Sequence, residues 1–312
     1  MNRWLQIVGK IFDRFLFESC DPRMASVLRI AYAVLLLLYV AIWSLDGSRW
    51  FSNEGVLSVG TAQRMFSIPY WSLFFFDSSN AFVHACLAIL FLQSGLLLVG
   101  CWSRFQSACI FVWLTSFQHR NLLICDGEDT VFRLFAFFFI FLPLDTVWSM
   151  TAKRHTDPLS RAQSSSAWGL RLIQIEITAI YLSAGWSKLQ GATWRDGSAL
   201  YYVSRMDDYF GRFGLLESLF DFPWFVMFVT WTSLATELIL PFALWFKPTR
   251  RAAIVAGIVM HLSIEVSMNL FLFEWIMIVG LLSFVKPEEW GFARRTLASY
   301  SLDSVDQLSG GN

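Results

Sequence analysis

The sequence predicts an all-α membrane protein, a polytopic bundle of transmembrane helices with short interfacial helices on its non-cytoplasmic side. Three observations support this fold class. Of the 312 residues, 56% are hydrophobic and 15% are charged, whereas soluble domains contain about 25% charged residues. Phe (31) and Trp (15) are abundant. Apolar runs of roughly 20 residues, the length that crosses a bilayer, recur along the chain.

Residues 1–23 form the first predicted element, an amphipathic leader on the cytoplasmic surface. Charged residues such as Lys10 and Arg14 are interleaved with apolar ones at helical spacing. The apolar side chains that would share one face are Trp4, Leu5, Ile7, Val8, Ile11, Phe12, Phe15 and Leu16.

Residues 24–286 form the predicted transmembrane domain. Long apolar runs lie at 24–44, 81–100, 130–149, 167–187, 224–246 and 251–269, and shorter ones at 105–118 and 271–285. The short runs suit either tilted spans or re-entrant segments. We therefore expect about eight transmembrane helices, with seven as the alternative.

Positive charge sets the predicted orientation. With the N-terminus in the cytoplasm, Lys and Arg on the cytoplasmic side outnumber those on the other side by two to one, in agreement with the positive-inside rule. Residues 287–312 then form a polar cytoplasmic tail. The sequence thus predicts a multi-pass protein of a bacterial inner membrane with both termini inside.

Two non-cytoplasmic segments, 45–80 and 188–223, are too apolar to be simple connectors. Both are rich in Trp, Tyr and Phe, which favour the membrane–water boundary. We expect short interfacial helices there, placed to cover a cavity between the spans. The lipid bilayer is the first predicted partner, and the formal net charge of zero gives no reason to expect nucleic acid.

Ionisable residues interrupt the predicted spans, at a cost of roughly 2.5–3.5 kcal/mol per charge on insertion scales. They form either structural ion pairs or a polar cavity, and the two are compatible. His261 and Glu265 share a helix face, but with Glu237 they are too few to predict a metal site. The full set is Arg29, Arg133, Arg171, Glu176, Glu237, His261, Glu265 and Glu274.

Lys188 is the most informative of the polar residues. It ends an apolar helix and is followed by Trp194, Arg195 and Asp196. An ammonium group at a membrane boundary is either a snorkelling anchor or, when kept dry and unpaired, a base with a lowered pKa. Asp129 lies with Asp126 and Glu128 at the start of another predicted helix. There it either belongs to an N-cap cluster that fixes the helix entry, with Arg133 four residues later as an ion-pair partner, or orients Lys188 or a substrate.

Several motifs, taken in order, resemble one family. They are His119-Arg-Asn121, Asp126-Gly-Glu-Asp129, Ser183-Ala-Gly-Trp-Ser-Lys188-Leu189, Trp194-Arg-Asp-Gly197, Thr236-Glu237-Leu238 with Pro241, Lys247-Pro-x-Arg-Arg251 and Met260-His261. This set resembles the horizontally transferred transmembrane (HTTM) domain over residues 15–290, a domain shared with vitamin K-dependent gamma-carboxylases.

The resemblance implies a role for Lys188. In the animal carboxylase, a lysine in the matching Gly-x-x-Lys-Leu context deprotonates vitamin K hydroquinone, and oxygen then generates the base that allows a glutamate to be carboxylated. Lys188 is the implied base here, and a vitamin K-like quinol the implied cofactor. Asp129 stands where the carboxylase has a histidine. One small bacterial-type member is associated with maturation of a secreted peptide toxin.

Three hypotheses follow. The first is a carboxylase-like enzyme, a lyase or oxidoreductase, that acts on a quinol, a lipid or a secreted peptide. The second is a non-catalytic membrane factor for maturation or export of a partner peptide, and the third is a transporter. In the enzyme hypothesis Lys188 and Asp129 are catalytic, and the cavity is lined by Asn121, Trp194, Arg195, Asp196, Glu237 and His261.

Overall fold

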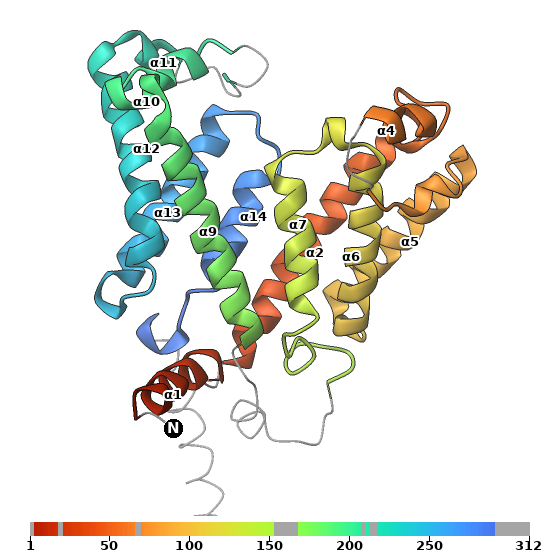
Figure 1. The fold of residues 1–312 in the computed structure, drawn as a ribbon, viewed down its shortest axis with the longest axis horizontal. Helices are drawn as coiled ribbons and strands as arrows, with labels where there is room; N and C mark the ends of the chain where they lie inside the picture. Colours follow the sequence, from red (N-terminus) through yellow and green to blue (C-terminus); the bar gives the residue numbers. More distant parts are fainter. Residues whose placement is uncertain are drawn as a thin grey trace, which may run out of the picture.

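The computed structural model describes residues 3–17, 21–65, 70–152, 168–206, 210–211 and 217–290. In these ranges the protein is helical and has no β-strand, which confirms the all-α class; Phe210 and Met268 form an isolated bridge. The long helices run between two ends of a bundle, and short helices gather at one of them (Figure 1).

The described residues of the first half of the chain hold five longer helices with short ones between them. Side-chain caps mark the starts of three of them, because helix N-termini carry unsatisfied N–H groups: Asp21 accepts from Arg23 before α2, Ser79 from Phe82 before α5, and Asp126 from Glu128 before α7. The elements are α1 (Arg3–Phe17), α2 (Pro22–Leu45), α3 (Gly47–Phe51), α4 (Val59–Met65), η1 (Leu73–Phe75), α5 (Asn80–Val99), α6 (Ser103–Arg120), η2 (Leu122–Ile124) and α7 (Gly127–Phe139).

The second half begins with the long helix that carries Lys188. Pro223 stands in the first turn of α12, where its fixed φ suits a helix start. Pro241 lies inside α12 and cannot donate to the carbonyl of Glu237, four residues earlier. The elements are α9 (Trp168–Gln190), α10 (Ala192–Asp196), α11 (Ala199–Val203), η3 (Glu217–Asp221), α12 (Pro223–Ala243), α13 (Lys247–Ser267), α14 (Phe273–Leu282) and η4 (Pro287–Trp290).

Packing places α14 at the centre of the bundle. It contacts α2, α7, α9 and α13, while α2 packs against α5 and α9 packs against α12. In Figure 1, α9, α12 and α13 lie on one side of α14, and α2, α5 and α6 on the other. Polar residues on α9, α12, α13 and α14 therefore meet inside one half of the bundle.

Three of the described helices are long and apolar enough to cross a membrane: Arg23–Leu45, Asn80–Val99 and Pro223–Ala243. Phe273–Leu282 is a shorter apolar helix. These helices support a membrane protein, and the count of eight spans stays a prediction.

The predicted span 130–149 differs from the structure, because α7 ends at Phe139. Pro143 has no N–H to continue a helix, and Trp148 adopts a positive φ of 49°. The intramembrane Arg29 closes this turn. Its guanidinium donates to the carbonyls of Leu97 (2.9 Å), Leu98 (3.0 Å) and Trp148 (2.5 Å). Arg29 therefore caps the last turn of α5 and the turn that follows α7.

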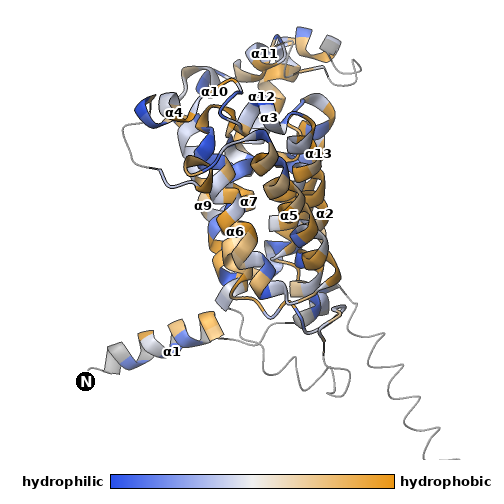
Figure 2. Cartoon of the chain, turned by 90° about the vertical axis from the view of Figure 1, so that its right-hand side faces the viewer, coloured by the Kyte–Doolittle hydropathy of each residue, from blue (hydrophilic) through white to orange (hydrophobic). Residues whose placement is uncertain are grey.

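Short helices mark the two ends of the bundle. The helices α4, α10 and α11 lie at the end opposite α1, which projects sideways from the bundle base (Figure 2). The helix α1 is joined to α9 through Arg171, whose Nε donates to the carbonyl of Phe15 at 3.0 Å. An interfacial location for all of these helices stays a prediction. Cys20, residues 207–209 and 212–216, and the predicted tail beyond residue 290 lie outside the described residues.

Candidate functional site

Lys188 forms an ion pair with Glu237. Lys188 lies in the last turn of α9, and its Nζ donates to Glu237 Oε1 on α12. The Lys188 side chain is 26% exposed and that of Glu237 8%, so the pair sits at the edge of the buried interior. The Trp194 ring, on α10, lies 4.7 Å from Nζ. The structure thus joins three predicted site residues, but the expectation of an unpaired amine is wrong.

A close approach of two helices brings this pair together. A Cβ on Gly185 would lie 2.9 Å from Leu238 Cδ2 and 3.6 Å from the Glu237 carbonyl carbon. Residues three and four apart share a helix face, so Tyr181 precedes Gly185 by one turn and Lys188 follows it by one turn. Glu237 therefore faces α9 between Tyr181 and Lys188.

The second carboxylate oxygen of Glu237 is the unusual atom of the site. Glu237 Oε2 is buried and has no hydrogen-bond partner among the described residues. A buried acceptor without a donor costs about 1–3 kcal/mol. This oxygen is therefore placed to accept a hydrogen bond or a proton from a group that enters the site.

A second buried cluster joins three helices next to this pair. The Tyr181 hydroxyl lies 2.5 Å from His261 Nε2, and His261 Nδ1 hydrogen-bonds to Glu274 Oε2. Their exposures are 2%, 3% and 1%. With Nδ1–H donating to the carboxylate, Nε2 accepts from the phenol. Tyr181 and Lys188 lie about two turns apart on one face of α9, so the two clusters adjoin.

Sequence reasoning found His261 but missed its partners. It paired His261 with Glu265 on one helix face, whereas the partners Tyr181 and Glu274 come from α9 and α14. The signal that could have found Glu274 was an ionisable residue within an apolar run. The described residues contain no group of three or more side chains suited to a metal ion.

Asp129 lies in a separate cluster at the start of α7. The Tyr39 hydroxyl donates to Asp129 Oδ1, and Oδ2 accepts from the Asp126 N–H at 2.7 Å. This completes a capping box. Arg133, the expected partner of Asp129, instead lies 3.2 Å from His119 Nε2. Asp129 therefore fixes the entry to α7, and its catalytic role stays a prediction.

Asn121 is also a local structural residue. Its Nδ2 donates to the Trp50 carbonyl at 3.0 Å, and its Oδ1 accepts from the Leu123 N–H. The neighbouring Cys125 lies in the loop before α7, where burial raises the pKa of its thiol to about 12. The Asn121 side chain joins the α3 region to the end of α6, and its place in a cavity stays a prediction.

Arg195 and Asp196 lie at the exposed end of α10. The Ser198 hydroxyl and backbone N–H donate to Asp196 Oδ1 at 2.6 and 2.9 Å, and these hydrogen bonds lower the pKa of Asp196. Asp196 thus orders the turn between α10 and α11, and a ligand contact by either residue stays a prediction.

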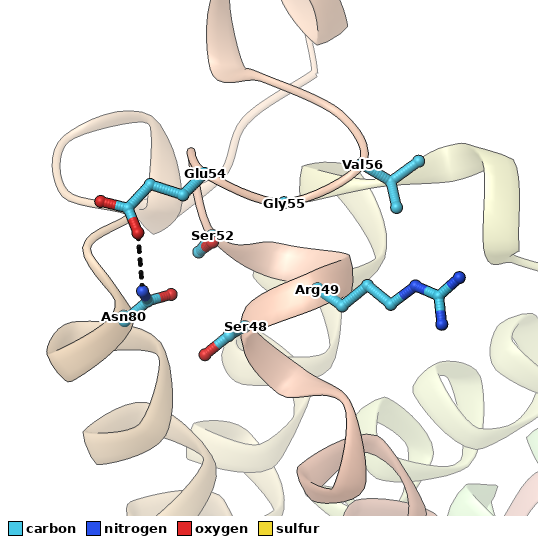
Figure 3. Close-up of a pocket in the computed structure, with 7 residues that line it drawn as sticks. All are labelled: Ser48, Arg49, Ser52, Glu54, Gly55, Val56 and Asn80. Carbon is cyan, nitrogen blue, oxygen red and sulfur yellow. Dashed lines mark hydrogen bonds between the residues drawn. The ribbon is translucent and has the colours of Figure 1, made fainter.

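A cavity of about 490 Å³ lies elsewhere, at the end of the bundle that carries α4. Asn80 Nδ2 donates to Glu54 at 2.8 Å on one side of it, and Arg49 extends to the other side (Figure 3). It contains none of the predicted site residues. Its lining is Ser48, Arg49, Ser52, Glu54, Gly55, Val56 and Asn80.

Comparison with known proteins agrees with the motifs. The chain is 24% identical over 217 residues to the Uncharacterized protein YitO of Bacillus subtilis (strain 168), which covers 67% of each chain. It is 25% identical over 204 residues to the Sporulation-delaying protein SdpB of the same organism, covering 62% of this chain and 61% of SdpB. No solved structure matches.

The match to a family model is more extensive than either pairwise match. The HTTM domain model covers residues 17–290, which include every helix from α2 to α14. The long apolar helices, the Lys188 segment and the Glu237 segment all lie inside it. The chain therefore belongs to the HTTM domain family.

Proposed function

We propose that this protein acts in the membrane on the maturation or export of a small secreted peptide, with Lys188 and Glu237 as its acid–base site. The observation that carries the proposal is the ion pair between Lys188 and Glu237, at the edge of the buried interior and beneath the Trp194 ring. Membership of the HTTM family, one bacterial-type member of which is associated with maturation of a secreted peptide toxin, supports the peptide as the class of partner.

The pair is suited to moving a proton. Lys188 Nζ is already hydrogen-bonded to the Glu237 carboxylate, and a proton transfer between the two groups requires this contact. A neutral Lys188 amine would then accept a proton from a substrate. The Trp194 ring stabilises the cation that forms, because an ammonium is attracted to an aromatic face.

The chemistry of the residues present fits a hydroquinone as the implied cofactor. The unpartnered Glu237 Oε2 is an acceptor for a hydroxyl donor, and the Trp194 ring, 4.7 Å from Lys188 Nζ, offers a flat aromatic face. When bound, a hydroquinone supplies a weakly acidic hydroxyl group. Lys188 and Glu237 would hold it, and Lys188 would take its proton.

Replacement of Lys188 tests the proposal. Lys188→Arg keeps a cation for Glu237, but guanidinium does not deprotonate in proteins, so we expect peptide maturation to fall by on the order of 10²-fold or more. Lys188→Met should fall as far. Peptides in the medium of producing cells are quantified by mass spectrometry, with thermal unfolding of each purified variant as the control for folding.

A non-catalytic docking role is the second candidate, and exposed aromatic residues favour it. Tyr202 (59%), Phe222 (50%) and Trp224 (67%) are exposed around α11 and the start of α12. Such residues suit contact with a peptide or the lipid boundary. Normal maturation with Lys188→Arg would select this role and exclude the acid–base one.

A further inference from the structure

The cavity of about 490 Å³ at the α4 end of the bundle has no part in the proposed acid–base site. Its size is typical of small-molecule sites, and its lining carries one cation, Arg49, and one anion, Glu54. These two side chains extend to opposite sides of the cavity (Figure 3). A ligand that pairs with both must itself carry two opposite charges.

Glu54 and Asn80 form the acidic side of the cavity. Asn80 Nδ2 donates to Glu54 Oε2 at 2.8 Å, which holds the carboxylate in place. Glu54 Oε1 and Asn80 Oδ1 have no partner among the described residues. Both atoms are acceptors, and a primary ammonium is a donor of three hydrogen bonds. This side of the cavity therefore suits an ammonium group.

Arg49 and Ser52 provide the groups for an anion. The Arg49 guanidinium lies 5.2 Å from the Trp50 ring, and no described carboxylate pairs with it. Ser52 follows three residues later on the same helix face. It also lines the cavity, and its buried Oγ has no hydrogen-bond partner in the described part of the chain. A phosphate would satisfy both residues, because guanidinium binds its oxygens in pairs and a hydroxyl donates to them.

Arg120 adds a buried positive charge next to Ser52. Its side chain is fully buried, and its Nη2 donates to the carbonyls of Ser52 and Leu57 at 2.7 Å each. Its Nε and Nη1 have no hydrogen-bond partner among the described residues. A buried charge without a counterion is costly. An anion held near Ser52 lowers this cost through space.

A membrane-spanning helix leads away from the cavity. Asn80 begins α5, which is long and apolar enough to cross a membrane and lies at the edge of the bundle (Figure 1). Phe91 follows Asn80 by about three turns on the same face of α5, and its side chain is 47% exposed. The acyl chains of a lipid could therefore lie along this face while its headgroup fills the cavity.

We propose that this cavity binds the zwitterionic headgroup of a phospholipid, with the phosphate at Arg49 and Ser52 and a primary ammonium at Glu54 and Asn80. Phosphatidylethanolamine has both groups, whereas phosphatidylglycerol has the phosphate alone. The site lies in the half of the bundle opposite Lys188 (Figure 1). It does not depend on the proposed acid–base function.

Lipid binding to the purified full-length protein in detergent tests the site. Native mass spectrometry measures the Kd of phosphatidylethanolamine and of phosphatidylglycerol. We expect the first to bind about three-fold more tightly. Glu54→Gln keeps an acceptor for Asn80 but removes the charge, so it should abolish this preference and leave phosphatidylglycerol binding intact. Arg49→Gln should weaken both lipids about ten-fold, because both lose the phosphate contact.

Matched charges outside the cavity provide the controls. Arg64→Gln removes an exposed arginine on α4, and Asp46→Asn removes an exposed acid before α3. Neither should change either Kd. The retained phosphatidylglycerol binding of Glu54→Gln shows that this variant is folded. Equal Kd values of the two lipids for the unmodified protein, or Kd values in Arg49→Gln and Glu54→Gln that match the controls, would overturn the proposal.

A soluble competitor distinguishes the two sources of the headgroup. Glycerophosphoethanolamine carries the same phosphate and ammonium without acyl chains. If it displaces phosphatidylethanolamine at concentrations near the Kd of the lipid, the cavity takes a free zwitterion, and the lipid is excluded as the specific ligand. If a hundred-fold higher concentration leaves the lipid bound, the ligand is the membrane lipid.

Discussion

Arg29 and Gly100 show how a single buried charge is made tolerable in an apolar interior. Arg29 is fully buried, and it donates to three backbone carbonyls, two in the last turn of α5 and one in the turn after α7. Those carbonyls come within reach because Gly100 adopts a φ of 74°, the left-handed conformation that glycine accepts. The charge is therefore held by backbone dipoles.

Gly100→Ala should destabilise the protein. The new Cβ would lie 2.3 Å from Arg29 Nη1 and 2.7 Å from Ser149 Cα, and a non-glycine residue in this conformation costs about 1–3 kcal/mol. Gly95→Ala, inside the helix α5 that Gly100 caps, has nothing within 4 Å of the new Cβ and should be neutral or slightly stabilising. Thermal unfolding in detergent measures both, and equal midpoints would contradict the prediction.

Single residues also show how far the sequence predicts the site. Lys188 was predicted as a catalytic residue and Trp194 and Glu237 as cavity residues, and the structure joins the three. The family motifs carried that prediction. The partners of His261 and Asp129 were not predicted, because contacts between different helices leave no spacing signal within either one.

At the scale of elements, the apolar runs predicted the starts of α2, α5 and α12 to within about two residues. The end of α7 was placed ten residues too late, because hydropathy alone does not show where an apolar chain turns. Pro143, which is incompatible with a helix interior, was the local signal.

The leader helix α1 gives a prediction at this scale. Arg171 donates to the Phe15 carbonyl, and its guanidinium carbon lies 5.0 Å from the Phe15 ring and 6.0 Å from that of Trp245. Arg171→Met should weaken α1 docking by about 1–2 kcal/mol. Hydrogen exchange of the amides of Arg3–Phe17 should speed up. Arg104→Met, which removes a bond to the Leu142 carbonyl instead, should leave α1 unchanged.

At the scale of the whole molecule, the middle of the bundle is mostly hydrophobic, and hydrophilic segments, among them part of α4, lie toward its ends (Figure 2). Composition and helix length carried this part of the prediction. The number of membrane crossings is a different matter, because only three of the described helices combine sufficient length with sufficient hydropathy.

Site-directed labelling tests the predicted orientation. Thr61 on α4 and Thr249 at the start of α13 are exposed, and these two helix regions lie at opposite ends of the bundle (Figure 1). In intact cells a membrane-impermeant maleimide should label Thr61→Cys, and Thr249→Cys only after permeabilisation. Cys125 should stay unlabelled, because maleimides react with thiolates and its thiol pKa is about 12. Labelling of Thr249→Cys in intact cells would reverse the orientation.

Pro241 ties the mechanics of the molecule to its chemistry. The missing N–H makes α12 easiest to bend at the level of Glu237. The helix α12 also packs against α10, α11 and η3. A displacement of those short helices would therefore bend α12 near Pro241. Glu237 lies at the bending point, where the displacement of the helix would be smallest, so its ion pair with Lys188 would be preserved while the neighbouring short helices move.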